Sequence, residues 1–309
     1  MDEFALIRRY FDRPGDNARG VSLGIGDDAA LLQVPAGHEL AVTTDTMVEA
    51  VHFPADAPAH GIGYRALATN LSDLAAMGAT PAWATLAVTL PGADAAWIEA
   101  FSRGFFELAD AFDVALVGGD VTRGPLTITV GMYGVVAAGT ALRRSGARPG
   151  DRIVVTGALG EAAAGLKAWP LADGGGRYLY PQPRVAEGQA LRGYASAAID
   201  ISDGLLADLG HIIEASGVGA EVAAGQVPLA PTLASFDSAT ARETALTGGD
   251  DYELCFTIEP ERLDALRQVW QPEWAELHEI GVISDQRTLR CIAPDGTLWQ
   301  PDAPGYRHF

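Results

Sequence analysis

The spacing of apolar residues predicts a series of helices along the chain. Leu67, Leu71 and Leu74 recur three or four positions apart, which predicts a long helix over residues 59–77. An aromatic stripe predicts a second long helix over residues 95–112. The same periodicity predicts shorter helices over residues 3–13, 161–168, 185–191, 204–216 and 260–269.

Strands are predicted where apolar residues alternate with polar ones or form short unbroken runs. Residues 126–137 alternate threonine with apolar residues, the period-two pattern of a strand. Other strands are predicted over residues 30–34, 40–44, 82–90, 114–117, 152–156, 197–201, 252–258, 277–283 and 290–292. Because helices and strands mix without strict alternation, we expect an α/β or α+β fold with partly antiparallel sheets.

A basic, turn-rich stretch over residues 139–151 marks a domain boundary. It carries Arg143, Arg144 and Arg148 before a Pro-Gly pair, within an otherwise acidic chain. The length of 309 residues also favours two domains, since a domain has roughly 150 residues. We therefore expect an N-terminal domain over residues 1–140 and a C-terminal domain over residues 141–309.

Composition excludes several classes of partner. The formal net charge of −19 argues against nucleic acid and anionic membrane surfaces. No apolar run approaches the roughly 18 residues of a membrane span, and no secretory leader opens the chain, so a cytoplasmic protein is expected. Cys255 and Cys291 lie far apart, which favours two buried thiols over a disulfide or metal site.

Aspartates recur beside glycine and serine in five places. These clusters are Gly26-Asp27-Asp28, Asn70-Leu71-Ser72-Asp73, Gly118-Gly119-Asp120, Asp200-Ile201-Ser202-Asp203 and Gly248-Gly249-Asp250-Asp251. Adjacent carboxylates repel each other unless a cation lies between them. The clusters therefore predict convergence on divalent metal and phosphate.

The first cluster also fits a relaxed dinucleotide-binding fingerprint, which we reject. That fingerprint needs a helix after it, whereas residues 30–34 predict a strand. The alternative for Asp27 and Asp28 is a turn in which they cap backbone N–H groups.

Other candidate ligands have structural alternatives of their own. Thr43, Thr44 and Asp45 offer oxygen donors at an expected strand end, and the apolar residues 40–42 imply burial up to that point. Asp73 is either a solvent-facing residue of its helix or an inward ligand. Asp120 is expected directly after a strand. Ser202 or Asp203 could equally be the N-cap of the following helix.

Two further positions remain open on the residues alone. Arg144 suits phosphate recognition, but a solvated linker charge is equally compatible with its position. The Gly157–Gly160 turn could hold an anion at a helix start, although an ordinary turn is favoured.

The sequence lacks the motifs of several catalytic classes. It has no P-loop, no protein-kinase signature, no nucleophile elbow and no His-Glu-x-x-His motif. Phosphoryl transfer in such a chain would depend on metals and positioning. A phosphate acceptor has a second pKa of about 6, so it would need charge cancellation and no general base.

Seven ordered motifs together resemble the thiamine-monophosphate kinase family. They are G-I-G-D-D-A-A-L, T-T-D-T, N-L-S-D-L-A-A-M-G-A, G-G-D-V-T-R-G-P, R-S-G-A-R-P-G-D, A-I-D-I-S-D-G-L and G-G-D-D-Y-E-L, and the resemblance runs from Phe4 to Phe309. It implies a transferase of thiamine diphosphate biosynthesis that phosphorylates thiamine monophosphate by direct in-line transfer from ATP. It also implies a homodimer whose N-terminal sheets pair into a barrel-like core.

The resemblance further implies roles for individual residues. Several Mg²⁺ ions would be held by Asp28, Thr44, Asp45, Asp73, Asp120, Asp200 and Asp203. ATP would contact Gly119, Asp120, Arg144 and Ser202. Thiamine monophosphate would contact His52, Asp250 and Tyr306, where an acid and an aromatic face suit a flat cation. Asp27 is left out of the metal set.

Two kinds of rival are weighed against this assignment. One is another ATP-using enzyme of the same superfamily, of the selenophosphate synthetase or aminoimidazole ribonucleotide synthetase type. A selenophosphate synthetase usually has a reactive Cys or selenocysteine near its N-terminus, whereas the first cysteine here is Cys255. The other rival is a nucleotide-binding module without turnover.

Overall fold

The structure is a computed structural model that describes residues 3–13, 20–170, 175–301 and 303–306. Residues 307–309, the last three of the stretch that resembles the family, lie outside this range. The chain divides into two compact units, Met1–Leu74 with Ala79–Gly139, and Ala75–Gly78 with Thr140–Phe309. Both contain helices and mixed sheets, which confirms the expected α/β class with two domains.

The first unit is built on a four-stranded sheet in the order β3-β6-β4-β5. Its elements are α1 (Glu3–Tyr10), β1 (Val21–Leu23), β2 (Leu31–Leu32), β3 (His38–Val48), α2 (Ala59–Ala76), β4 (Thr80–Leu90), α3 (Ala95–Ala111), β5 (Ala115–Arg123) and β6 (Thr127–Ala137). Strand β6 pairs antiparallel with β3 and β4, whereas β4 and β5 are parallel and joined by α3. The sheet is therefore mixed and open, with β3 and β5 at its edges.

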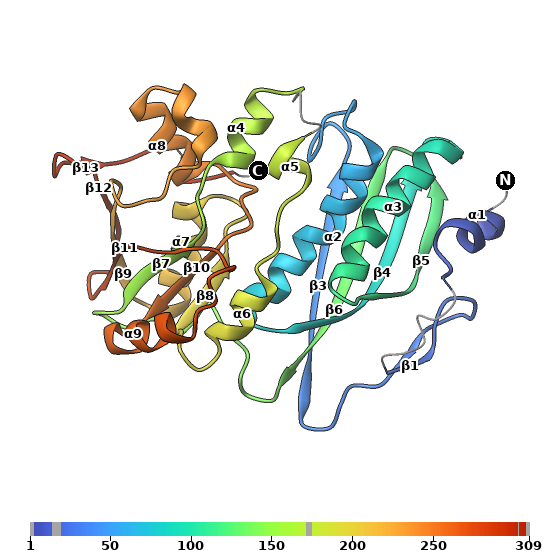
Figure 1. The fold of residues 1–309 in the computed structure, drawn as a ribbon, viewed down its shortest axis with the longest axis horizontal. Coiled ribbons are helices and arrows are strands. Elements are labelled where there is room, and N and C mark those ends of the chain that lie inside the picture. Colours follow the sequence, from blue (N-terminus) through green and yellow to red (C-terminus); the bar gives the residue numbers. More distant parts are fainter. Residues whose placement is uncertain (1–2, 14–19, 171–174, 302, 307–309) are drawn as a thin grey trace. The chain divides into compact units, whose positions relative to one another are not determined.

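Helices α2 and α3 cover one face of this sheet (Figure 1). They pack closely because each has a glycine where it meets the other. A Cβ on Gly63 would lie 2.1 Å from the Phe101 carbonyl oxygen, and one on Gly104 would lie 1.9 Å from that of His60. Asp94 caps α3 by accepting from the N–H groups of Ala96 and Trp97.

The β1–β2 hairpin packs on residues of the same sheet. Val21 and Leu32 of the hairpin contact a buried cluster that includes Trp83 and Val117. The turn that carries Asp27 and Asp28 joins β1 to β2. A strand therefore follows this turn, as expected, and the rejection of a dinucleotide fingerprint is confirmed.

The second unit contains a seven-stranded sheet in the order β13-β12-β9-β11-β7-β10-β8. Its elements are β7 (Arg152–Thr156), α4 (Glu161–Lys167), α5 (Gly176–Leu179), α6 (Val185–Leu191), β8 (Ala197–Asp200), α7 (Leu205–Ser216), β9 (Gly219–Ala223), η2 (Pro231–Ser235), α8 (Ser238–Thr247), β10 (Leu254–Ile258), α9 (Pro260–Val269), β11 (Leu277–Ser284), β12 (Leu289–Ile292) and β13 (Leu298–Trp299). Strands β12 and β9 are parallel, and the other pairs are antiparallel.

The core of the second unit lies between this sheet and α7. Leu205, Leu209 and Ile212 of the helix are fully buried against strand residues such as Ile153 and Cys255. Cys255 and Cys291 are both buried free thiols, as expected. Burial raises the pKa of the Cys291 thiol to about 11, so it stays protonated and unreactive.

Candidate active site

Strand β3 and helix α2 are joined by two hydrogen bonds that involve predicted metal ligands. The Thr43 hydroxyl donates to Asp73 Oδ2 at 2.5 Å. Asp45, two residues further along the strand, is hydrogen-bonded by Thr69, which lies one helical turn before Asp73. Asp73 thus points inward toward the strand and not to solvent, while its role as a metal ligand stays a prediction.

Asp45 is a partly buried carboxylate whose charge is incompletely compensated. Burial raises its pKa, while the hydrogen bond from Thr69 and electrostatic interactions with Arg65 and His52 lower it to a smaller extent. Because burial dominates, the ionised form would gain from a further positive charge at this point. This is the electrostatic environment that suits a bound cation.

Thr44 and Asp45 point to opposite faces of the sheet. Residues in this part of β3 alternate between exposed and half-buried, with Thr44 exposed and Asp45 half-buried. Thr44 lies near Gly131 of β6, and its hydroxyl donates to the Thr43 carbonyl. Thr44 and Asp45 are therefore adjacent in sequence, but their side chains do not meet at one point in space.

Two expectations about β3 are wrong. The strand runs on to Val48, so Thr44 and Asp45 lie inside it and not at its end. Leu40 and Val42 are 43% and 59% exposed, so residues 40–42 are not buried as inferred. Pairing with β6 extends the strand to Val48, and helix α2 contacts the opposite face of β3, which carries Thr43.

Asp27 and Asp28 are both exposed in the turn between β1 and β2. Asp27 Oδ1 accepts the N–H of Asp28 at 2.8 Å. Asp27 therefore has the capping role considered from the sequence, whereas the Asp28 carboxylate is not used in that bond.

Gly119 and Asp120 lie within β5, which continues to Arg123. The expected end of the strand before Gly118 is therefore wrong, because parallel pairing with β4 extends through Thr122 and Arg123. Gly119 is required here by close approach, since a Cβ would lie 1.9 Å from the Leu86 carbonyl oxygen. Asp120 is exposed and pairs in register with Ala87.

His52 lies in the turn after β3, close enough to Asp45 to lower the pKa of that carboxyl. Its Nδ1 accepts the backbone N–H of Val48 at 3.0 Å. Because Nδ1 is an acceptor, the ring proton is on Nε2, which can donate. The first unit therefore brings a predicted substrate residue and a predicted metal ligand together.

The second unit brings its own predicted residues together around the end of β8. Asp200, which is buried, ends that strand, and Ser202 and Asp203 follow it. The Asp250 N–H donates to the Ser202 carbonyl at 2.8 Å, and the Tyr306 N–H donates to the Asp203 carbonyl at 2.9 Å. Tyr306 itself is 51% exposed.

The N-cap role considered for Ser202 or Asp203 is wrong. Gly204 is the N-cap of α7, and no side chain caps it there. The backbone N–H groups of residues 202, 203 and 204 instead donate to Asp208 Oδ2 at 3.0, 3.0 and 3.1 Å. Asp208 reaches back from the first turn of the helix, and burial, followed by the charge of Asp203, raises its pKa to about 7.

The buried carboxylate of Asp251 contacts the start of α4. The N–H of Gly160 donates to Asp251 Oδ2 at 2.7 Å. The Gly157–Gly160 segment is thus an ordinary turn whose donor is satisfied within the protein, as favoured from the sequence. Burial raises the pKa of Asp251 to about 7.

Glu253 is fully buried and accepts hydrogen bonds from two arginines. Arg184 Nε donates to Oε2 at 2.7 Å, and Arg177 Nη2 donates to Oε1 at 2.7 Å. The Thr156 hydroxyl also donates to Oε2 at 2.7 Å. This network lies directly before β10 and holds its first residues against β7.

Arg144 is exposed, as is its neighbour Arg143. Arg148, the third member of the basic cluster, pairs with Glu259 at 3.3 Å. Part of the positive charge near the domain boundary is therefore paired with an acidic residue of the second unit.

Among the described residues, the one group of three acidic or histidine side chains close enough to share an ion is Asp203, Asp208 and His211. Their ligand atoms lie within 4.8 Å of one another. Asp208 and Glu253 were not among the candidate residues, whereas Thr43 and Asp251 lay in candidate motifs but were given no role in the site. The signal for Asp251 and Glu253 was their place in the same motif as Asp250, but their internal partners could not be found from sequence spacing.

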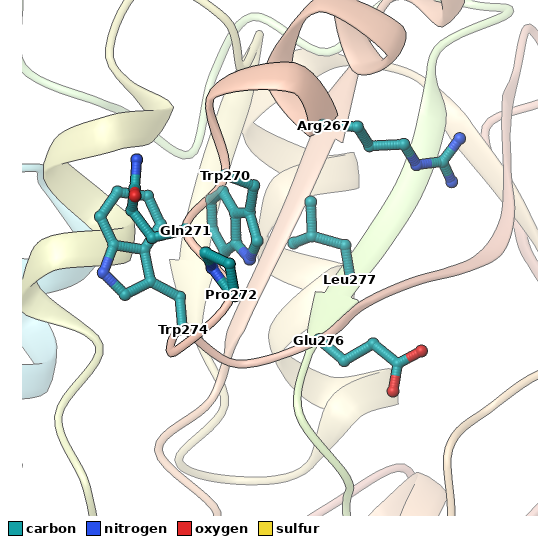
Figure 2. Close-up of a pocket in the computed structure, with 7 residues that line it drawn as sticks. All are labelled: Arg267, Trp270, Gln271, Pro272, Trp274, Glu276 and Leu277. Atoms are coloured by element: carbon teal, nitrogen blue, oxygen red, sulfur yellow. The ribbon is translucent and has the colours of Figure 1, made fainter.

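The described surface of the second unit has a hollow that contains none of the predicted site residues. It measures about 420 Å³ and follows α9 (Figure 2). Its lining consists of Arg267, Trp270, Gln271, Pro272, Trp274, Glu276 and Leu277. The rings of Trp270 and Trp274 pack edge to face with their centroids 5.0 Å apart. The Trp270 indole N–H donates to the Ala275 carbonyl at 2.8 Å.

Within the part of the chain that the structure describes, every helix is too short or too polar to span a bilayer.

The chain is similar to known proteins over nearly its full length. The models for AIR synthase related proteins match residues 26–136 with the N-terminal domain and residues 148–293 with the C-terminal domain. The thiamine-monophosphate kinase of Escherichia coli (strain K12) is 46% identical over 318 residues, which cover 99% of this chain and 98% of that protein.

Two solved structures are similar over nearly the whole chain. The crystal structure of thiamine-monophosphate kinase from Stenotrophomonas maltophilia K279a has a TM-score of 0.84 and 47% identity, and the match covers 96% of each chain. A structure described as AaThiL complexed with AMPPCP and TMP has a TM-score of 0.79 and 31% identity, and the match covers 92% of each chain.

Proposed function

The chain belongs to the thiamine-monophosphate kinase family, and from that premise we propose that it phosphorylates thiamine monophosphate with ATP to give thiamine diphosphate and ADP. The observation that carries this proposal is the identity to a kinase of that name over nearly the full length of both proteins. The AaThiL structure, which is described with AMPPCP and TMP, supports the same pair of substrates.

We assign Mg²⁺ binding to the aspartate-rich motifs of each unit. Asp28, Thr44, Asp45, Asp73 and Asp120 belong to the first unit, and Asp200 and Asp203 belong to the second. These donors are all oxygen atoms, which Mg²⁺ prefers. The fit is supported at Asp45, where burial raises the pKa of the carboxyl and a cation would offset that cost.

The substrate-binding residues have chemistry that suits thiamine monophosphate. Asp250 is an acid that can neutralise the thiazolium, and its half-buried position limits competition from water. Tyr306 offers an aromatic face to the same flat cation. His52 Nε2–H is a donor for a phosphate oxygen, because Nδ1 is already used by the Val48 N–H.

For ATP we assign Gly119, Asp120, Arg144 and Ser202. Gly119 can offer only backbone groups, because the Leu86 backbone occupies the place of its Cβ, and the guanidinium of Arg144 is exposed and suited to phosphate oxygens. In this assignment residues 1–140 bind ATP and metal and form the dimer, and residues 141–309 supply the remaining ATP- and substrate-binding residues.

The reaction is a direct in-line transfer between two anions. A phosphate oxygen of thiamine monophosphate attacks the γ-phosphorus of ATP, the bond to the β–γ bridging oxygen breaks, and ADP leaves with that electron pair. Bound Mg²⁺ would supply the positive charge that offsets repulsion between the two phosphates. The residues of the chain bind and orient the substrates, and no general base is needed because the acceptor is already ionised.

We further propose a homodimer formed through the first unit. Strand β3 is at a sheet edge, and its uncovered face exposes Leu40 and Val42. Pairing with a second copy would remove this apolar surface from water and complete a barrel-like core.

Phosphorus NMR of the purified protein with ATP, Mg²⁺ and thiamine monophosphate tests the proposed reaction. Equal amounts of ADP and thiamine diphosphate are expected. Formation of AMP and orthophosphate with selenide as co-substrate would instead indicate a selenophosphate synthetase. Unchanged ATP with every acceptor tried would indicate a nucleotide-binding module.

A further inference from the structure

The loop that joins α8 to β10 carries Asp250 in an unusual backbone conformation. Asp250 has φ of 71° and Tyr252 has φ of 51°, both in the left-handed region that side chains rarely adopt. Such residues persist only where the surrounding structure holds them. The position of the Asp250 carboxylate therefore depends on what holds the loop.

Backbone hydrogen bonds hold this loop on one side. The Asp250 N–H donates to the Ser202 carbonyl at 2.8 Å, and the Tyr252 N–H donates to the Ile201 carbonyl at 2.9 Å. The Tyr252 hydroxyl also donates to Asp250 Oδ1 at 3.1 Å, which orients that carboxylate.

Asp251 holds the loop from the other side. It lies between the two left-handed residues and is only 6% exposed. Its Oδ2 accepts the Gly160 N–H at 2.7 Å, and its Oδ1 lies 3.5 Å from the N–H of Ala162 in the first turn of α4. These contacts tie the middle of the loop to an element that is distant in sequence.

We propose that Asp251 is a positioning residue for the substrate: it holds Asp250 in the left-handed conformation by binding the start of α4. This rests on the proposed role of Asp250 in binding thiamine monophosphate. Asp251 itself is buried and does not contact the substrate. Without its acceptor oxygens the loop can relax to ordinary φ values, and the Asp250 carboxylate then moves away from its bond with Tyr252.

The test compares Asp251→Leu, Asp251→Asn and Asp250→Asn with the matched control Asp237→Ala. Leucine has the same branching as aspartate but cannot accept, and asparagine keeps one acceptor oxygen. Asp237 is also an aspartate that accepts two backbone N–H groups at a helix start in the second unit, but it lies outside the loop. Each variant is measured for KM of thiamine monophosphate, KM of ATP, and hydrogen exchange over residues 248–253.

Asp251→Leu is expected to raise KM for thiamine monophosphate about tenfold or more while KM for ATP stays within about twofold. Amide exchange at residues 250 and 252 should accelerate in the same variant. Asp251→Asn should show smaller changes in both readouts, and Asp237→Ala should show neither. A wild-type KM for thiamine monophosphate together with wild-type exchange in Asp251→Leu would overturn the proposal. If that variant does not fold, the same result in Asp251→Asn would do so.

The readouts separate this proposal from the assignment of Asp250. Fast exchange in Asp251→Leu with no effect of Asp250→Asn on KM would mean that Asp251 holds the loop but that Asp250 does not bind the substrate. Equal loss of affinity for both substrates in Asp251→Leu would indicate a purely structural role and contradict positioning.

Discussion

The Thr43 hydroxyl donates to Asp73 Oδ2 at 2.5 Å and so connects an edge strand to the helix that covers it. The bond fixes which way the Asp73 carboxylate points, although the two residues are 30 positions apart. A parallel contact joins Asp45 to Thr69 one helical turn away. Two acidic residues of the proposed metal site are therefore positioned by threonine hydroxyls.

Replacing Thr43 should weaken the binding of Mg²⁺. Thr43→Val keeps the shape of the side chain but removes its hydroxyl, so Asp73 loses an oriented donor. We expect activity to fall about tenfold and the Mg²⁺ concentration for half-maximal rate to rise. Initial rates measured against Mg²⁺ concentration test this. Thr46→Val is the control, because the Thr46 hydroxyl is hydrogen-bonded to the Thr129 hydroxyl and not to a carboxylate. Equal losses of activity in both variants would contradict the prediction.

Asp45→Asn should abolish phosphoryl transfer while leaving the fold intact. Because burial raises the pKa of Asp45, its ionised form is disfavoured in the folded, metal-free protein. The same variant is therefore expected to have a higher Tm than wild type in chelator at neutral pH. Turnover assays and thermal unfolding check both parts, with the exposed Asp56→Asn as control. Full activity in Asp45→Asn would refute the metal assignment.

Stability should fall as the pH rises through neutrality, in part because of Asp251. Its pKa is raised from 3.8 to about 7 by burial, so the folded protein binds this proton more tightly than the unfolded chain. The stabilisation is present below about pH 4 and is lost as the pH rises through about 7. Urea unfolding at about pH 5 and about pH 9 should show a smaller difference for Asp251→Asn than for wild type. An unchanged difference would contradict this reasoning.

Val42→Asp should weaken self-association. Val42 is 59% exposed on the uncovered face of β3, and a charge there would have to be buried in the proposed dimer. Val51→Asp is a matched control, because Val51 is 57% exposed in the same unit but lies outside β3. Sedimentation velocity should show monomers for the first variant and dimers for the second. Equal dimer affinities in both variants would exclude this face of β3 as the dimer interface.

Glu253→Gln should destabilise the second unit by about 3 kcal/mol, because Arg177 and Arg184 would lose their buried counter-charge. Glu279→Gln is the comparison: that carboxylate pairs with Arg267 at 2.6 Å but is partly exposed, so at most about 1 kcal/mol is expected. Denaturant unfolding measures both. A similar small effect for the two variants would mean that the buried network contributes little.

Local pattern predicted much of the fold. Helix α9 and helix α6 begin and end at the expected residues, and α2 and α3 differ from expectation by one residue each. The apolar residues of these segments recur at helical spacing, a signal that depends only on neighbours in sequence. Helix α8, which is only weakly amphipathic, and strand β9 were missed.

The ends of β3 and β5 could not be predicted in the same way. Asp45 and the run Gly118-Gly119-Asp120 consist of residue types that are depleted in strands, yet both strands continue through them. Pairing with β6 and with β4 supplies the hydrogen bonds that extend them. Such partners lie far away in sequence and outweigh local preference.

The sequence by itself determined the class of fold, the family and the identity of the acidic motifs, because each of these depends on residue types and their order. The tertiary structure decided which oxygen meets which partner: Thr43 with Asp73, three N–H groups with Asp208, and Gly160 with Asp251. A hydrogen bond requires two atoms to approach within about 3 Å. Spacing along the chain does not specify that approach when packed strands and helices bring together residues that are remote in sequence.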